Sequence, residues 1–218
     1  MSDNEASAAA LPALEICRAA LKANGFTVYG VPTADAAGSL ILDELMPAIA
    51  PKVVSWGDSM TLAATGVIEA LLNDSKIEVI RTFDDTVPRE MLIERRRRAL
   101  LCDLFFTGSN AMTLSGELVN LDMIGNRVAG LVFGPRHVIV TVGRNKVVPS
   151  LEAAMTRIRN HAAPANAARH GFKTPCVKEG RCMDCRSPQR ICNVWTITAK
   201  SYPKGRIAVI LIEEDLGL

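Results

Sequence analysis

The sequence predicts an α/β protein with a parallel-core sheet flanked by helices, antiparallel additions and a C-terminal cysteine-rich arm. Strand and helix patterns alternate through the first half of the chain, which is the signature of a parallel sheet with covering helices. Beyond residue 116 the strand patterns follow one another across turns too short for crossover helices. Four of the six cysteines then fall between residues 176 and 192. We expect an α/β core at 1–163, the arm at 164–193 and a strand pair returning to the core at 194–218.

Apolar spacing and cap residues predict the elements of the first half. Leu14, Cys17 and Leu21 recur at helical spacing before Asn24-Gly25, a C-cap signal. Pro51 ends a helix that Thr33 caps. After the first helix we expect strands at 26–31, 52–56, 77–81 and 103–106, alternating with helices at 33–49, 60–72 and 88–101.

In the second half the alternation of strand and helix patterns stops, and strand patterns are joined by two glycine turns, Gly125-Asn126 and Gly134-Pro135. Apolar, β-branched runs lie on both sides of these turns, so antiparallel neighbours or hairpins are expected. The expected elements are strands at 116–122, 128–133 and 138–142, a helix at 149–162, an irregular linker at 163–174, and a closing pair of strands at 194–199 and 206–212.

Charge and hydropathy exclude several classes of protein. The 25 basic and 23 acidic residues leave a net charge of +2, too small to indicate nucleic acid or anionic lipid as a partner. The basic run Arg95–Arg98 follows Glu94 in a helical pattern and is typical of a solvated helix face. No apolar stretch reaches the roughly 18 residues of a membrane span, and residues 1–10 resemble a tail rather than a secretory signal. We expect a cytoplasmic protein.

Two loops follow strands of the predicted parallel sheet, where backbone N–H groups and small polar side chains are free to bind a ligand. Glycine lets the backbone approach a ligand, and hydroxyl and amide groups bind phosphate or carboxylate. An ordinary helix cap without a ligand is the alternative for the first loop. Neither loop matches a P-loop or a dinucleotide fingerprint. The candidate ligand-binding residues are Gly57, Asp58, Ser59 and Thr61 in the first loop and Thr107, Gly108, Ser109 and Asn110 in the second.

A third polar segment supplies the candidate catalytic residue, Glu117. Strand alternation places Asn120 and Asp122 on one face and Glu117 on the other unless a bulge intervenes. The alternative is that these groups bind turns and pair with Arg127. The candidate ligand-binding set is completed by Asn120, Asp122, Asn126 and Arg127. The turn at 143–146 is expected at the surface, and the scattered histidines are expected to be structural or exposed.

The cysteine segment has the spacing C-x5-C-x2-C-x6-C, formed by Cys176, Cys182, Cys185 and Cys192. Four thiolates in an arm with little core of its own suit a zinc ion or a [4Fe-4S] cluster. The alternative is free or redox-paired thiols, since the spacing is neither a standard zinc ribbon nor the bacterial ferredoxin run. The remaining Cys17 and Cys102 lie in apolar patterns typical of core positions.

Five short motifs are specific in combination. They are Trp56-Gly-Asp-Ser-Met-Thr-Leu62, Thr107-Gly-Ser-Asn110, Ser115-Gly-Glu-Leu-Val-Asn-Leu-Asp122, Gly125-Asn-Arg127 and Phe133-Gly-Pro135. Together these motifs resemble the LUD, or lactate-utilisation, domain family, and the similarity extends from about Ala13 onward. The resemblance implies a fold similar to that of sugar-phosphate isomerases and CoA transferases. It also implies a link to the oxidation of L-lactate to pyruvate, in which a related protein works beside iron–sulfur partners.

Two hypotheses follow for the function. The first is an accessory component of an L-lactate oxidation system, with iron–sulfur protein subunits as partners and a metal or iron–sulfur site on the four cysteines. The second is an enzyme or sensor that binds a small phosphorylated, carboxylate or CoA-ester ligand between the two glycine loops. In the second, Glu117 acts as a nucleophile or general base. A pure docking role is a third reading of the same fold.

Overall fold

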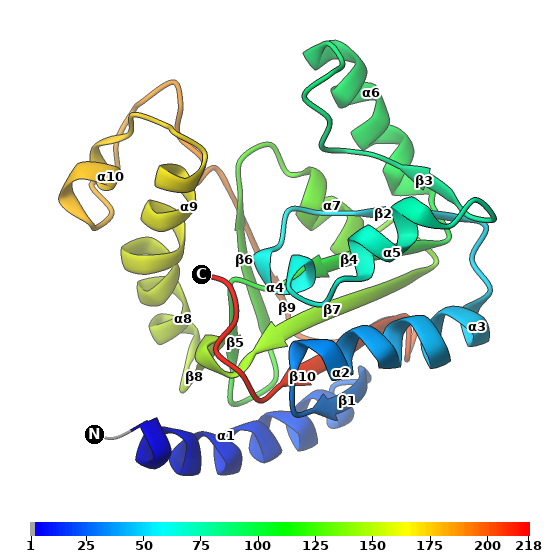
Figure 1. Cartoon of the computed structure of the whole chain (residues 1–218). Coiled ribbons are helices and arrows are strands. Elements are labelled where there is room, and N and C mark those ends of the chain that lie inside the picture. Colours follow the sequence, from blue (N-terminus) through cyan, green and yellow to red (C-terminus); the bar gives the residue numbers. More distant parts are fainter. Residues whose placement is uncertain (1–2) are drawn as a thin grey trace.

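The computed structural model describes residues 3–218, with side chains from Pro12 onward, and confirms the predicted α/β fold with a parallel core (Figure 1). Within this range one sheet has six strands, and every neighbouring pair of them is parallel. In spatial order its strands are β1 (Thr27–Val31), β10 (Ile207–Ile212), β7 (His137–Gly143), β4 (Leu104–Gly108), β2 (Val53–Trp56) and β3 (Glu78–Ile80).

The main sheet separates two apolar cores because successive side chains of a strand point to opposite faces. On β4, Leu104 and Phe106 belong to one core and Phe105 to the other. The core of Leu104 is covered by α2 (Ala34–Ser39), η1 (Leu40–Leu45), α3 (Met46–Ile49), α4 (Met60–Ala63) and α5 (Val67–Asn73). The core of Phe105 is covered by α1 (Asp3–Ala23), by α7 (Asn126–Val132) and by a second sheet.

The second sheet forms a further layer and supplies the predicted antiparallel additions. Its strand β6 pairs antiparallel with β5 and β9, while β5 and β8 are parallel. Leu118 points into the core that contains Phe105, whereas Val119 and Leu121 face the helix α8 (Leu151–Arg157). In spatial order the strands are β8 (Val147–Val148), β5 (Ala111–Thr113), β6 (Leu118–Asp122) and β9 (Val194–Thr198).

The strand expected at 128–133 is wrong, because this segment is the helix α7. Gly125 adopts φ 89°, a conformation that suits glycine, and α7 begins directly after it. Gly130 then brings the helix close to the sheet: a Cβ there would lie 2.8 Å from the ring of Phe105. With a helix between them, β6 and β7 do not form a hairpin, and β7 joins the main sheet in parallel with β4 and β10.

The strands expected at 194–199 and 206–212 are present, but the expectation that they pair with each other is wrong. The first strand, β9, lies on the edge of the second sheet, and the second, β10, lies inside the main sheet between β1 and β7. The segment expected as a linker at 163–174 is helical as far as Arg169. The tail expected at 1–10 is helical from Asp3, and residues 1 and 2 lie outside the described range. The remaining helices are α6 (Arg89–Arg98), η2 (Ala99–Leu101), η3 (Arg144–Lys146), η4 (Ile158–Ala162), α9 (Ala163–Arg169) and α10 (Pro175–Glu179).

None of the helices in residues 3–218 combines the length and hydropathy that crossing a membrane requires.

Replacing Ile210 by alanine should lower the free energy of unfolding by about 2–5 kcal/mol, because this side chain is fully buried in an interior strand. The matched control is Ile197→Ala, which removes the same atoms from a side chain that is 44% exposed on β9. The control should cost less than about 1 kcal/mol. Urea unfolding of both variants measures the difference, and equal losses would contradict the interior position of β10.

Candidate functional site

The carboxyl ends of β2 and β4 form the place where an open parallel sheet holds a ligand. Within the main sheet, the next strand along the chain after β2 is β3, which lies on one side of it. The next strand of this sheet after β4 is β7, which lies on the other side, so the strand order reverses between the neighbours β2 and β4. At such a switch point the loops diverge and leave a crevice outside the sheet. The structure brings the two glycine loops together there, since a Cβ on Gly108 would lie 2.4 Å from Oγ of Ser59.

Arg127, at the start of α7, binds the polar residues that surround this crevice. Its side chain is almost entirely buried, and each guanidinium nitrogen has an acceptor. Burial lowers the pKa of Arg127, and the carboxylates of Asp122 and Asp58 oppose that shift. The acceptors are Asn120 Oδ1 (2.7 Å) and Gly108 O (3.2 Å) for Nη1, Asn110 Oδ1 (2.9 Å) and Leu121 O (2.9 Å) for Nη2, and Asp122 Oδ2 (3.3 Å) for Nε.

Glycine is required at position 57 because the stem of Arg127 passes directly over it. A Cβ on Gly57 would lie 2.4 Å from Cγ of Arg127.

The side chain of Asn120 has a donor without a partner. Its Oδ1 accepts from Arg127 and from the backbone N–H of Asn110, while its buried Nδ2 has no hydrogen-bond partner. Asp122 accepts from the backbone N–H of Gly125 at 3.0 Å, which fixes the turn before α7.

The structure does not bring Glu117 to this group. Its carboxylate accepts from the hydroxyls of Thr113 (2.5 Å) and Ser115 (2.8 Å). The neighbouring Gly116 lies against α1, where a Cβ would be 2.8 Å from the backbone nitrogen of Leu21. Glu117 therefore lies at the opposite end of β6 from Asp122, and its described contacts do not include the glycine loops.

Several other candidates shape the loops rather than face a ligand. Ser59 caps α4 by accepting from Leu62 N at 3.1 Å. Ser109 donates to Ala111 O at 2.8 Å, and Thr107 donates to Gly108 O at 3.2 Å. Asn126 is the first residue of α7, next to Arg127.

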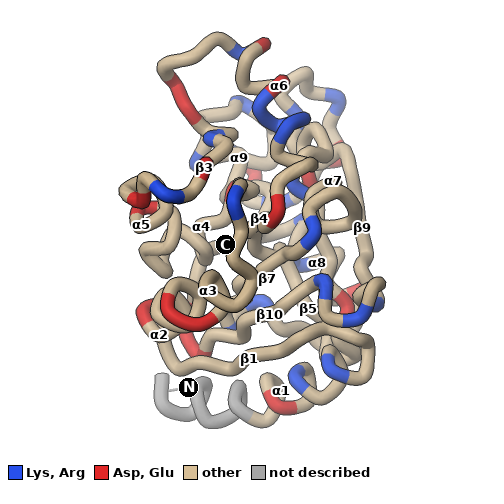
Figure 2. The backbone as a smooth tube through the Cα atoms, turned by 90° about the vertical axis from the view of Figure 1, so that its right-hand side faces the viewer, with Lys and Arg blue, Asp and Glu red and all other residues tan. Residues whose placement is uncertain are grey.

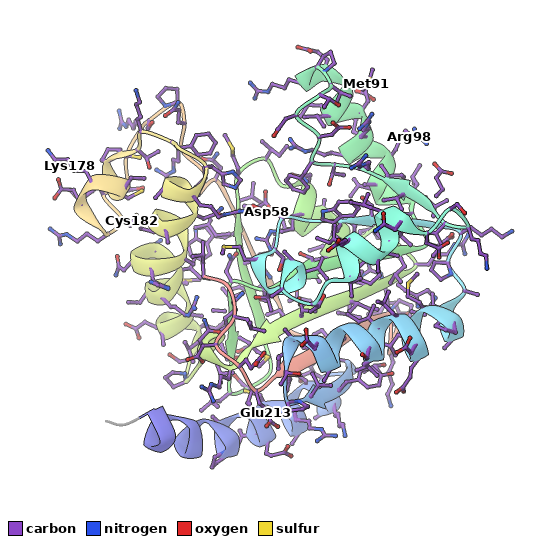
Figure 3. The ribbon with its side chains drawn as sticks, viewed as in Figure 1. Asp58, Met91, Arg98, Lys178, Cys182 and Glu213 are labelled. Atoms are coloured by element: carbon purple, nitrogen blue, oxygen red, sulfur yellow. The ribbon has the colours of Figure 1, made fainter. Side chains whose placement is uncertain are left out.

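The continuous helix formed by α8, η4 and α9 lies beside the crevice and contacts three of its loops. Arg157 donates to the backbone oxygens of Asn110 (2.7 Å) and Asn145 (3.2 Å), which follow β4 and β7. At the end of α9, Arg169 and His170 both contact Asp58, which follows β2. Asp58 is labelled in Figure 3. Figure 1 shows this helix beside the carboxyl edge of the main sheet.

Lys146 is a site residue that sequence reasoning missed, since the turn at 143–146 was expected at the surface. It is 5% exposed, and its Nζ donates to Oγ1 of Thr61 at 2.7 Å. Burial, together with the positive charges of Arg157 and Arg127, lowers the pKa of Lys146 to about 7. The signal that could have found it is its position three residues after β7, a largely apolar parallel strand, at the carboxyl edge of the sheet.

Lys146 and Arg157 have no acidic partner among the described ion pairs. Leu216 and Gly217 lie over the amine, because Thr61 donates to Leu216 O at 3.1 Å and a Cβ on Gly217 would be 3.1 Å from Nζ. The carboxyl edge thus contains a buried amine and a guanidinium beneath a short covering segment.

A cavity lined by apolar side chains lies at the other end of the main sheet. This groove of about 510 Å³ runs between η2 and the end of α7, just before β4 and β7 begin. Two of its apolar side chains are unusually exposed, Leu101 at 85% and Phe133 at 83%. The lining residues are Arg97, Leu100, Leu101, Ala129, Val132, Phe133 and Gly134.

The four cysteines of the arm are reduced and partly exposed. Burial raises the pKa of Cys192, Arg190 opposes this, and the other three thiols are close enough to raise it further. As they stand, no group of three or more histidine, cysteine or acidic side chains within the described residues has the arrangement of a metal site.

A parallel sheet, a topological switch point and a ring of polar side chains around a buried arginine define an open α/β protein with a candidate site for a polar ligand. The LUD domain model matches residues 14–212, and the chain belongs to the LUD domain family. This family is associated with lactate utilisation. The structure is similar to that of a DUF162 family protein from Deinococcus radiodurans, at 15% identity and a TM-score of 0.49 over 93% of this chain and 98% of that one. The comparison with curated proteins gave no match.

The lowered pKa of Lys146 predicts a stability that rises with pH. The buried ammonium is unfavourable in the folded protein, so the unfolded chain binds this proton more tightly between pH 7 and the ordinary value of 10.5. Stability should rise in that window by up to about 1.4 kcal/mol per pH unit. Below pH 7 both the folded and the unfolded chain hold the proton, so Lys146 should add no pH dependence there.

Urea unfolding between pH 6 and 10 tests this prediction. Lys146→Met should remove the rise, whereas Lys52→Met, which replaces an exposed lysine, should keep it. An identical pH dependence in the wild-type protein and the Lys146 variant would show that the amine is charged in the fold.

Proposed function

We propose that this chain serves lactate utilisation in the cytoplasm by binding a small organic anion at the carboxyl edge of the main sheet. The ligand class is a carboxylate or a phosphorylated compound, CoA esters included. The observation that carries the proposal is that Lys146 and Arg157 are neighbouring cations without an acidic partner in the described structure, at the switch point.

Two like charges that lie close together destabilise each other. Each also loses hydration, since Lys146 is buried and Arg157 is half-buried. An anion between them removes both penalties at once. The hydroxyl of Thr61, bound to Lys146 at 2.7 Å, adds a hydrogen-bonding group of the kind that suits a hydroxy acid. Asn120 contributes a further unpartnered N–H beside Arg127.

The segment of Leu216 and Gly217 occupies the position over the amine. It is held by the hydrogen bond from Thr61 and by Leu216 N donating to Asn145 Oδ1 at 3.2 Å. Two such neutral hydrogen bonds contribute only about 1 kcal/mol each. A charged ligand therefore has enough interaction energy to displace the segment.

Thermal-shift measurements with L-lactate, pyruvate, inorganic phosphate, a sugar phosphate and a CoA ester test this function. At a concentration about 100 times the dissociation constant, a true ligand should stabilise the fold by roughly 2.7 kcal/mol. Lys146→Met should abolish the shift, and Lys52→Met should retain it. The shift should also weaken above pH 7, because the free amine is then neutral.

Two outcomes contradict the proposal. One is the absence of stabilisation by every compound in the series at pH 6.5. The other is stabilisation that is equal in the wild-type protein and the Lys146 variant, which would place the ligand elsewhere.

A second candidate function is docking to an iron–sulfur protein subunit of a lactate-oxidising system, and the groove at the amino end of the sheet favours it. Exposed contiguous apolar side chains are uncommon on a protein that acts alone. Arg97 lines the groove, and Arg136 comes two residues after the lining residue Gly134, with a side chain that is 81% exposed. Figure 2 shows further basic residues on α6. Two copies of this chain would bring like charges together there, so the complementary partner is an acidic surface with aliphatic side chains.

Co-elution with purified iron–sulfur subunits of such a system tests the docking role. Phe133→Asp should abolish it by placing a charge in the apolar contact, whereas Tyr202→Asp, at a side chain that is 90% exposed elsewhere, should leave it intact. Co-elution that survives Phe133→Asp, or that never occurs, would contradict this role.

A further inference from the structure

The cysteine arm, residues 175–193, has no apolar core of its own. No residue in this segment is fully buried, and its only regular element is the single turn of α10. Compact domains rarely hold a segment of this length in place without secondary structure or a packed interior. Small folds of this kind are held together by disulfides or by metal ions.

Hydrogen bonds already draw the cysteine backbone together at one point. Arg190 donates to the backbone oxygens of Cys185 (2.7 Å) and Cys192 (3.2 Å), so that one guanidinium joins the third and fourth cysteines. Cys182 is anchored to the long helix through Asn160, which accepts its backbone N–H at 3.4 Å.

The loop between Cys182 and Cys185 has the geometry of a thiolate-binding turn. The backbone N–H of Asp184 donates to Sγ of Cys182 at 3.4 Å, and Asp184 adopts φ 42°, which closes the turn. Backbone N–H groups directed at a sulfur stabilise its thiolate form and tune a metal bound to it. Thr174, buried at the base of the arm, places its hydroxyl 3.1 Å from Sγ of Cys176.

The charge of the arm fits the same chemistry. Residues 175–193 contain four basic side chains, Lys178, Arg181, Arg186 and Arg190, and two acidic ones, Glu179 and Asp184, which leaves a charge of +2 (4 − 2). Four thiolates around a divalent ion carry two negative charges, so the arm and the centre would be neutral together. Figure 3 shows Lys178 and Cys182 on this arm, beside the long helix.

We propose that Cys176, Cys182, Cys185 and Cys192 bind one thiolate-ligated metal centre, a zinc ion or an iron–sulfur cluster, which closes the arm around it. The described side chains do not yet share one coordination sphere, so binding requires rotation of the thiols toward a common point. This site is independent of the proposed anion site, and each can fail without the other.

Metal analysis of the full chain, purified without oxygen and desalted, tests the proposal and separates the two kinds of centre. We expect about one zinc ion per chain, or about four irons with matching sulfide and visible absorbance. Cys185→Ser and Cys192→Ser should each lower the metal content at least tenfold. Cys17→Ala, at a buried cysteine outside the arm, is the matched control and should retain the metal.

Limited trypsin digestion supplies a readout that does not depend on the variants. Removing the metal with a chelator should expose the bonds after Arg181 and Arg186 to cleavage, while circular dichroism shows an unchanged α/β core. Metal-free protein whose arm resists trypsin would overturn the proposal. So would equal metal loss in Cys17→Ala and Cys185→Ser, or four thiols that alkylate freely before the chelator is added.

Discussion

The buried guanidinium of Arg127 is the interaction on which the rest of the site depends. A cation removed from water is tolerated only where its donors are all satisfied. Its acceptors come from the loop after β4 and from β6, so satisfying it ties the second sheet to the carboxyl edge of the first. Gly57 leaves the space for its stem. Losing Arg127 would leave Asp122 buried without its charge partner and would release both loops together.

The long helix from residue 151 to residue 169 links the site to the cysteine arm. Arg157 holds the loops after β4 and β7, while Arg169 and His170 hold Asp58 in the loop after β2. The arm begins only a few residues beyond His170, and Cys182 returns to the same helix through Asn160. Anything that orders the arm therefore restrains the end of α9 that contacts Asp58, which gives a physical route from the thiols to the crevice.

The first half of the fold could be predicted because its elements are local, with helical spacing and caps between apolar strands. The position of β10 inside the sheet could not, since it depends on parallel pairing with β1, whose residues lie about 180 positions earlier. Nor could the helix at 126–132, because a short apolar run such as Val128 to Val132 fits a buried strand and a buried helix equally well. In the fold this helix packs with Gly130 against Phe105, a contact between segments that are separate in the sequence.

The residues of the candidate site likewise include some that the sequence predicts and one that it does not. The glycine loops could be predicted, because close backbone approach requires glycine at the ends of parallel strands. Lys146 could not, because lysine is rarely buried and a basic turn normally faces water. Its burial follows from the segment of Leu216 and Gly217 folding back over Thr61. An amine held there without a carboxylate reduces the stability of the fold below pH 7, and the anion that we propose as the ligand would remove that cost. Under the proposed function, the site is therefore least stable when it is empty.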